Sequence, residues 1–248
     1  MKKYIIIRAD DLGYSEGINY GILKTVKDGI IKTVGLMVNM DHSIQGFELI
    51  KDYNCCIGLH TNISVGKPIC NPNEVQSLVD ENGFFKSSKV YRNSKEEFVN
   101  YNDVYREIEA QYLRFIEIVG RKPDYFEAHA VKSEMFFKAL EDFAVEYDLK
   151  YIPMKSKVEI GDKVVHMCPL NSMNKDYNAE ESIKDELSKL KVGEYSTYVC
   201  HPGYLDAYVF NTSSLLEGRI KEVDMLCDKN ISKWLKEYNF EIITYSDF

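Results

Sequence analysis

The sequence lacks long apolar runs and an excess of basic charge. Its first apolar run, residues 4–7, ends at Arg8 and is too short for a membrane span or a signal peptide. The 39 acidic residues outnumber the 31 basic ones and give a net charge of −8, whereas binding to nucleic acid or to an anionic membrane needs a basic face. We therefore expect a cytoplasmic protein with a small or neutral ligand and no nucleic-acid or membrane partner.

The cysteines also lack a recognisable pattern. Six are present, but none has the paired spacing of a zinc site, and the adjacent Cys55 and Cys56 would point to opposite faces of a strand. We expect them to be reduced and to act as small apolar residues. Internal repeats and low-complexity tracts are absent as well. The chain is therefore expected to form a single domain over residues 1–248.

The sequence does contain an alternation of strand-like and helical segments. Strands are expected at 4–9, 33–39, 55–60, around 126, at 151–154, 195–200 and 240–245, with a hairpin around Gly161-Asp162. Helices are expected at 16–27, 44–53, 96–119, 134–147, 180–190, 215–227 and 232–238. This alternation predicts an α/β fold with parallel strands joined by helices. About seven strands emerge, close to the eight of a barrel, and we expect residues 240–245 to close it.

One long segment, residues 64–93, breaks this alternation. It is rich in glycine, proline, asparagine and serine and follows the strand that ends at His60. Long stretches without regular structure inside a compact domain are usually lids or binding loops. We expect this segment to be a long active-site loop.

Two adjacent carboxylates, Asp10 and Asp11, follow the first apolar run and precede Leu12-Gly13. Enzymes of the α/β class carry their chemistry where strands open into loops. Neighbouring carboxylates repel each other and lose hydration together, so one of them is usually stabilised by a cation or kept protonated. The pair therefore indicates a metal site.

Three of the five histidines, His60, His129 and His201, end strand-like runs. A single histidine of this kind is more often a hydrogen-bonded structural residue than a ligand. Three in one chain, together with the carboxylate pair, favour a functional cluster.

These residues lie in four short motifs that resemble one family when taken together. The motifs are Ala9-Asp10-Asp11-Leu12-Gly13, Gly58-Leu59-His60, Pro123-Asp124-Tyr125-Phe126-Glu127-Ala128-His129 and His201-Pro202-Gly203. Their order and their spread along nearly the whole chain resemble the YdjC-like carbohydrate deacetylases, which include chitooligosaccharide deacetylase. The resemblance implies a distorted (β/α) barrel of the polysaccharide-deacetylase type, one divalent ion, Mg²⁺ or Zn²⁺, and removal of N-acetyl groups from short N-acetylglucosamine-containing oligosaccharides.

The same resemblance implies a role for each site residue. Asp11, His60 and His129 would be the metal ligands, Asp10 the general base and His201 the general acid. The chemistry of these groups agrees with that assignment, because one carboxylate and two imidazoles leave coordination positions open for water and a substrate carbonyl. Amide hydrolysis also needs a proton acceptor for water and a proton donor for the departing amine.

The chain departs from the family pattern at several positions. Ala130-Val131-Lys132-Ser133 stands where further histidines are common, Glu127 where an aspartate is usual, and Arg8 where an asparagine is usual. Glu127 is interpreted as a plain strand residue, with contact to His129 as the alternative.

Further polar and aromatic residues are weaker candidates. Asp206 either orients His201 or is a solvated loop residue. Arg219 and Glu222, three residues apart, form either a surface pair or a structural pair near the barrel rim. Tyr204 and Tyr208 are candidates for stacking on a sugar.

Two other functions are compatible with the sequence. A metal-dependent phosphoesterase or another amidohydrolase would use similar ligands, although few arginines and lysines surround the motifs to hold a phosphate. The other alternative is a catalytically eroded carbohydrate-binding protein, but Asp10 and His201 would not be needed for binding alone. The sequence leaves open whether the chain forms a homodimer.

Overall fold

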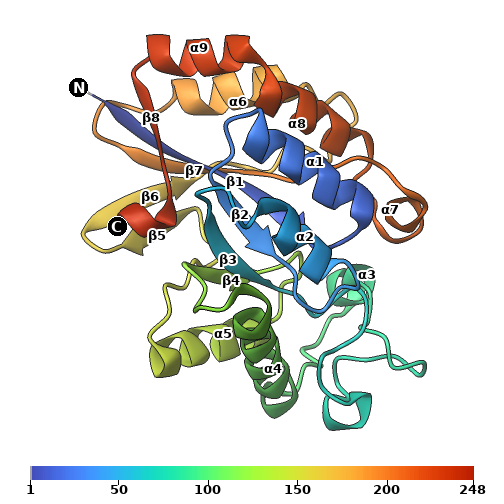
Figure 1. Ribbon diagram of the computed structural model, residues 1–248. Helices are drawn as coiled ribbons and strands as arrows, with labels where there is room; N and C mark the ends of the chain where they lie inside the picture. The colour runs from blue at the N-terminus through green and yellow to red at the C-terminus, as the bar shows by residue number, and fades with distance from the viewer. Residues whose placement is uncertain (1) are drawn as a thin grey trace.

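The centre of the sheet is strand β1 (Lys3–Leu12), in which Ile5, Ile6 and Ile7 are fully buried. The computed structural model describes residues 2–248, and in it a mostly parallel sheet surrounds β1 with helices packed around it (Figure 1). A run of β-branched residues buried on both faces is typical of a central parallel strand. The other strands are β2 (Thr33–Leu36), β3 (Cys56–Thr61), β4 (Phe126–Ala128), β5 (Lys157–Ile160), β6 (Lys163–Met167), β7 (Tyr195–Cys200) and β8 (Phe240–Ile243).

The strands follow the order β4-β3-β2-β1-β7-β6-β5, and only the β5–β6 hairpin is antiparallel. The predicted α/β fold of about seven mostly parallel strands is confirmed, and the strands form a half-barrel. Strand β8 was expected to close the barrel, and this expectation is wrong. It pairs with residues 3–6 of β1, on the same edge where β2 pairs with residues 8–12. Within residues 2–248 the path of strands therefore stays open between β4 and β5.

The helices begin and end largely where the sequence pattern changes. Ser15 accepts a hydrogen bond from the Ile18 N–H at the start of the first helix, and Gly120, with φ of 80°, ends the longest one. Asn100 caps that longest helix, which therefore begins five residues later than predicted. The helices are α1 (Glu16–Lys27), α2 (Ser43–Ile50), α3 (Ser88–Asn93), α4 (Tyr101–Val119), α5 (Glu134–Tyr147), α6 (Ala179–Ser188), α7 (Ala207–Thr212), α8 (Glu217–Cys227) and α9 (Lys229–Glu237), with 3-10 turns η1 (Pro72–Glu74) and η2 (Tyr245–Asp247). None of the described helices combines the length and the apolar composition needed to cross a membrane.

The two faces of the sheet bury different clusters. Ile5 and Ile7 of β1 pack in the large outer core that the helices cover, whereas Ile6 belongs to a smaller inner core. Because side chains alternate along a strand, Arg8 and Asp10 continue the inner face toward the C-terminal ends of the strands. The inner face is thus apolar at one end and charged at the other. The inner core comprises Ile6, Cys56, Tyr125, Ile152, Val158, Ile160, Val165 and Tyr245.

Residues 64–93 pack on α4 and contain regular structure, so the expectation of an irregular loop is corrected. They include η1, α3 and an isolated bridge between Val79 and Phe85. The buried carboxylate of Glu107 on α4 accepts hydrogen bonds from the N–H groups of Ile69 and Cys70, each at 3.0 Å. Short elements of this kind show no periodicity in the sequence and were therefore missed.

Candidate active site

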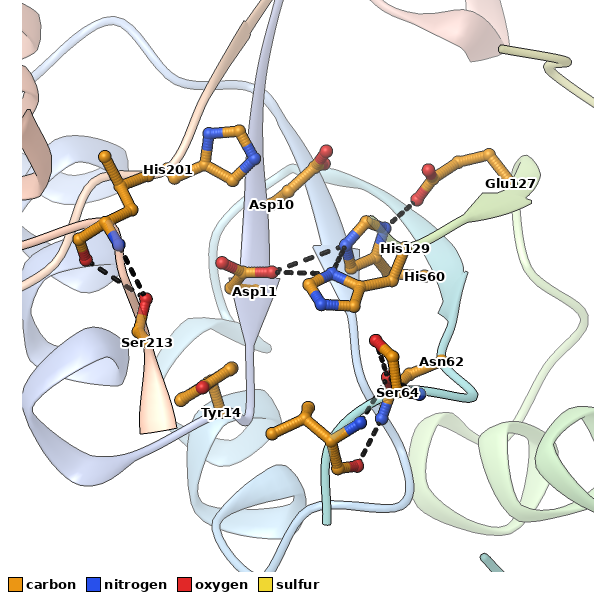
Figure 2. Close-up of polar contacts among 12 residues, drawn as sticks. Asp10, Asp11, Tyr14, His60, Asn62, Ser64, Glu127, His129, His201 and Ser213 are labelled. Atoms are coloured by element: carbon orange, nitrogen blue, oxygen red, sulfur yellow. Dashed lines mark hydrogen bonds and ion pairs between the residues drawn. The ribbon is translucent and has the colours of Figure 1, made fainter. Parts of the chain in front are cut away.

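A bulge in β1 re-aims one of its two neighbouring carboxylates. The register between β1 and β2 shifts between Ala9 and Leu12, and Asp11 has a φ of 76°. In a regular strand Asp10 and Asp11 would face opposite sides of the sheet, whereas a bulge changes the direction of a side chain. Figure 2 shows both carboxylates on the side of the histidine cluster. The left-handed backbone of Asp11 is uncommon for a non-glycine residue, and such strain is often found at functional sites.

Asp11, His60 and His129 bring three donor atoms together. His60 Nε2 and His129 Nδ1 each lie 3.3 Å from Asp11 Oδ1 and 2.9 Å from one another. Ligand atoms bonded to one ion at about 2.0–2.2 Å are separated from each other by about 3–3.6 Å, depending on the coordination geometry. Asp11 Oδ1 is also buried and receives no hydrogen bond from the described residues, which is unusual for a carboxylate oxygen. The cluster therefore fits a shared divalent cation.

The turn after β4 sets the position of His129. Its N–H donates to the carbonyl of Thr61 on β3, and the next residue, Ala130, has a φ of 52°. Val131 then enters the core, while Ser133 caps α5 by accepting from the Phe136 N–H. Two of the positions where the family often has further histidines thus serve packing and helix capping in this chain.

Glu127 contacts His60, which corrects its interpretation as a plain strand residue. The β3–β4 register places His60 opposite Glu127, and Glu127 Oε1 contacts His60 Nδ1. Arg8 Nη2 lies 2.7 Å from Asp10 Oδ2 and 3.4 Å from Glu127 Oε2, and all of these side chains are buried. Burial would raise the pKa of the Glu127 carboxyl, but Arg8 and His60 hold it below its ordinary value.

Arg219 and Glu222 are buried, so of the two alternatives the structural pair is confirmed and the surface pair is excluded. Arg219 Nη2 donates to Asp11 Oδ2 at 2.8 Å and Nη1 donates to the His201 carbonyl at 3.2 Å. Glu222 accepts hydrogen bonds from the His201 N–H at 2.6 Å and from the Tyr177 hydroxyl at 3.0 Å. The two side chains therefore hold the backbone of His201 from both sides. Their i, i+3 spacing is a weak sequence signal, because it is equally common on exposed helix faces.

The surroundings shift the pKa values of Asp11 and His201 by different causes. Burial would raise the pKa of Asp11, yet Arg219 and the two imidazoles hold it well below its ordinary value. Burial lowers the pKa of His201 to about 4, so its imidazole is neutral at pH 7. Figure 2 shows the His201 ring on the side of Asp10 and Asp11. His201 Nδ1 and Asp10 Oδ1 are both buried without a hydrogen-bond partner among the described residues.

The remaining candidates lie around this cluster. Asp206 does not contact the His201 imidazole, because its carboxylate caps α7 through the Val209 N–H and also accepts from the Gly17 N–H. Tyr208 is 40% exposed and packs edge-on against the buried ring of Tyr14, with 5.7 Å between the ring centroids. It therefore presents an aromatic surface beside the site.

The chain is similar to known proteins along nearly its whole length. The profile of the YdjC-like protein family matches residues 4–237. A protein of Listeria innocua named carbohydrate deacetylase 2 is 30% identical, over 98% of each chain. A crystal structure described as a putative cellobiose-phosphate cleavage protein from Enterococcus faecalis has a TM-score of 0.85 at 24% identity and covers 100% of this chain and 99% of its own. A family 4 acetyl xylan esterase from Clostridium thermocellum, solved with a cobalt ion, has a TM-score of 0.54 at 12% identity and covers 99% and 89%.

Proposed function

The chain belongs to the YdjC-like family, and on this premise we propose that it is a metal-dependent hydrolase that removes N-acetyl groups from short N-acetylglucosamine-containing oligosaccharides. The observation that carries the proposal is the cluster of Asp11 Oδ1, His60 Nε2 and His129 Nδ1, with separations of 2.9–3.3 Å, beside the free carboxylate oxygen of Asp10. The name of the Listeria relative supports the reaction, and the cobalt in the esterase structure supports a metal in this type of fold.

Asp11, His60 and His129 would hold the metal ion. When bound, a divalent ion supplies a Lewis acid that polarises the amide carbonyl and lowers the pKa of a coordinated water. Two imidazoles and one carboxylate suit Zn²⁺ better than Mg²⁺, because Mg²⁺ prefers oxygen ligands. We therefore propose Zn²⁺, or a similar transition metal, as the working ion.

Asp10 and His201 would carry the protons. Asp10 is held by Arg8 through Oδ2, which leaves Oδ1 free to accept a proton from the attacking water. His201 would give a proton to the amine nitrogen as the C–N bond breaks. Because His201 is neutral at pH 7 in the free site, it would act as an acid only after taking up a proton. That proton would be the one that Asp10 accepts from the attacking water and passes on to the His201 imidazole. Asp10 and His201 then end each turnover in the protonation states in which they began.

The surroundings of the site support a short substrate. Residues 64–93 follow His60 almost directly, and Glu107 of α4 holds them at Ile69 and Cys70, so they would line one side of the site. Tyr208 of α7 offers an exposed aromatic ring that packs on the buried ring of Tyr14. A site bounded in this way favours a di- or trisaccharide over a polymer, which needs an open groove.

The test is acetate release by the Zn²⁺-reconstituted protein from N-acetylglucosamine, its β-1,4-linked di- and trimers, and polymeric chitin. We expect release from the dimer or trimer, little from the polymer, and none after chelation. Efficient release from the polymer would refute the size argument. No release from any N-acetylated sugar, with hydrolysis of a phosphate ester instead, would replace this function with that of a phosphoesterase.

A further inference from the structure

A chain of four buried charged and polar side chains crosses the inner face of the sheet. It runs from Asp10 through Arg8 and Glu127 to His60, with Arg8 Nη2 at 2.7 Å from Asp10 Oδ2 and 3.4 Å from Glu127 Oε2. Glu127 Oε1 then contacts His60 Nδ1. The four residues are between 2% and 6% exposed. The chain therefore links the proposed base on β1 to a proposed ligand on β3 through a residue on β4.

Two glycines provide the space for this chain. Gly35 lies on β2, between the strands that carry the four residues, and a Cβ there would meet Asp10 Oδ1 at 2.9 Å and the His60 Cβ at 3.2 Å. Gly58 lies under the ring of Tyr125, where a Cβ would meet ring atoms at 2.3–2.5 Å, and the Arg8 guanidinium lies 5.8 Å from the centre of that ring. The absence of a side chain at Gly35 and Gly58 thus lets Arg8 reach across the sheet.

At Asp10 and at His60 each contact leaves a second polar atom of the side chain available. Arg8 binds Oδ2 of Asp10, and Oδ1 is left without a hydrogen-bond partner among the described residues. Glu127 engages Nδ1 of His60, and a hydrogen on Nδ1 puts the lone pair on Nε2, which faces Asp11 and His129.

We infer that Arg8 and Glu127 are paired positioning residues, with Arg8 orienting Asp10 for proton transfer and Glu127 fixing the tautomer and direction of His60 for metal binding. The part that concerns Asp10 rests on the proposed function, whereas the part that concerns His60 requires only a metal ion. Arg8 also compensates two buried carboxylates, which is a reason to test it with a substitution that keeps its charge.

Two conservative variants separate the roles. Arg8→Lys keeps the positive charge but removes the guanidinium, whose Nη2 contacts both carboxylates, and puts a shorter side chain in its place. Glu127→Gln keeps the size, but an amide cannot accept hydrogen bonds from both Arg8 and His60, because one of its two terminal atoms is a donor. The matched controls are Arg114→Lys and Glu117→Gln, which alter an exposed Arg–Glu pair on α4. The readouts are Zn²⁺ affinity, by competition with a chelating dye, and kcat at saturating Zn²⁺.

Glu127→Gln should weaken Zn²⁺ binding by about 10- to 100-fold, the usual effect of losing a partner of a metal-bound histidine. Arg8→Lys should lower kcat by about tenfold or more and change Zn²⁺ affinity by less than about threefold, because it acts on the orientation of Asp10. Both control variants should match the wild type in both readouts. Zn²⁺ affinity within about threefold of wild type in a folded Glu127→Gln protein, or an unchanged kcat in Arg8→Lys, would overturn the inference.

Two further measurements keep the outcome interpretable. If Glu127→Gln does not fold, Glu127→Asp keeps the charge beside Arg8 but shortens the reach to His60, and it should also weaken Zn²⁺ binding; wild-type affinity in that variant would refute the role of Glu127. If the wild-type protein releases no acetate, the proposed function fails, but the Zn²⁺ titrations still decide whether Glu127 positions His60.

Discussion

Arg219 donates a hydrogen bond to Oδ2 of Asp11 over 2.8 Å, so this carboxylate directs only Oδ1 toward the two imidazoles. The guanidinium also contacts the His201 carbonyl at 3.2 Å. One side chain from α8 therefore connects the end of β1, where the bulge presents Asp11, to the residue that follows β7. This connection fixes the position of Asp11, the proposed ligand, relative to His201, the proposed acid.

Replacing Arg219 should destabilise the metal-free protein more than the Zn²⁺-bound protein. Arg219→Gln leaves the Asp11 charge buried without its cation, and we expect the free energy of unfolding to fall by about 3 kcal/mol. Saturating Zn²⁺ should reduce this deficit, because the ion compensates the same charge. Urea unfolding with chelator and with Zn²⁺ measures both values, with Arg114→Gln as an exposed control. A deficit of equal size under both conditions would mean that Arg219 does not act through Asp11.

Asp10→Asn should remove turnover without removing the metal. The Asp10 carboxylate is outside the cluster of Asp11, His60 and His129, so Zn²⁺ affinity should change little. Loss of a general base should lower kcat by about 100-fold or more. The measurements are Zn²⁺ titration and acetate release at saturating metal. Loss of the metal together with recovery of activity at high Zn²⁺ would instead make Asp10 a ligand.

His201→Gln should also lower kcat by about 100-fold or more, because the departing amine loses its proton donor. Its backbone is held by Arg219 and Glu222, so the variant should fold and bind Zn²⁺ like the wild type. Thermal unfolding and Zn²⁺ titration serve as the structural controls. Wild-type kinetics in this variant would exclude His201 from the mechanism.

Glu222 should make stability depend on pH. Burial raises the pKa of this carboxyl from 4.5 to about 7, so between these values the folded protein binds more protons than the unfolded chain. The stabilisation is complete below about pH 4.5 and is lost as the pH rises through 7, by about 3 kcal/mol in total. Glu222→Gln removes this titration. Free energies of unfolding measured from pH 4.5 to 8 should therefore favour the variant increasingly as the pH rises, and a constant difference would contradict the assignment.

The sequence was sufficient for most of the fold because the main elements carry their own signals. The predicted bounds of α1, α5 and β7 agree with the structure, since periodicity and caps such as Ser15 and Ser133 are local features. The path of β8 was predicted wrongly, because strand propensity does not specify which edge a strand joins. Helix α3 was missed because six residues are too few to show a period.

The candidate site was only partly visible in the sequence. Carboxylates and histidines at strand ends could be recognised because parallel strands end at one edge of the sheet. The roles of Arg219, Glu222 and Glu127 could not, since each depends on a contact between segments far apart in the chain. Arg219 lies 208 residues from the Asp11 side chain that it contacts.

The sequence by itself determined which chemical groups stand at the ends of the strands, because strand alternation and turn residues can be recognised from neighbouring positions. Only the tertiary structure decided how those groups act together. The bulge at Asp11 turns one of two adjacent carboxylates toward the histidines. The packing of α8 buries Arg219 against Asp11 and Glu222 against the backbone of His201, so neither is a surface charge. The cost of burying a charge depends on everything that surrounds it, and no short stretch of sequence contains that information.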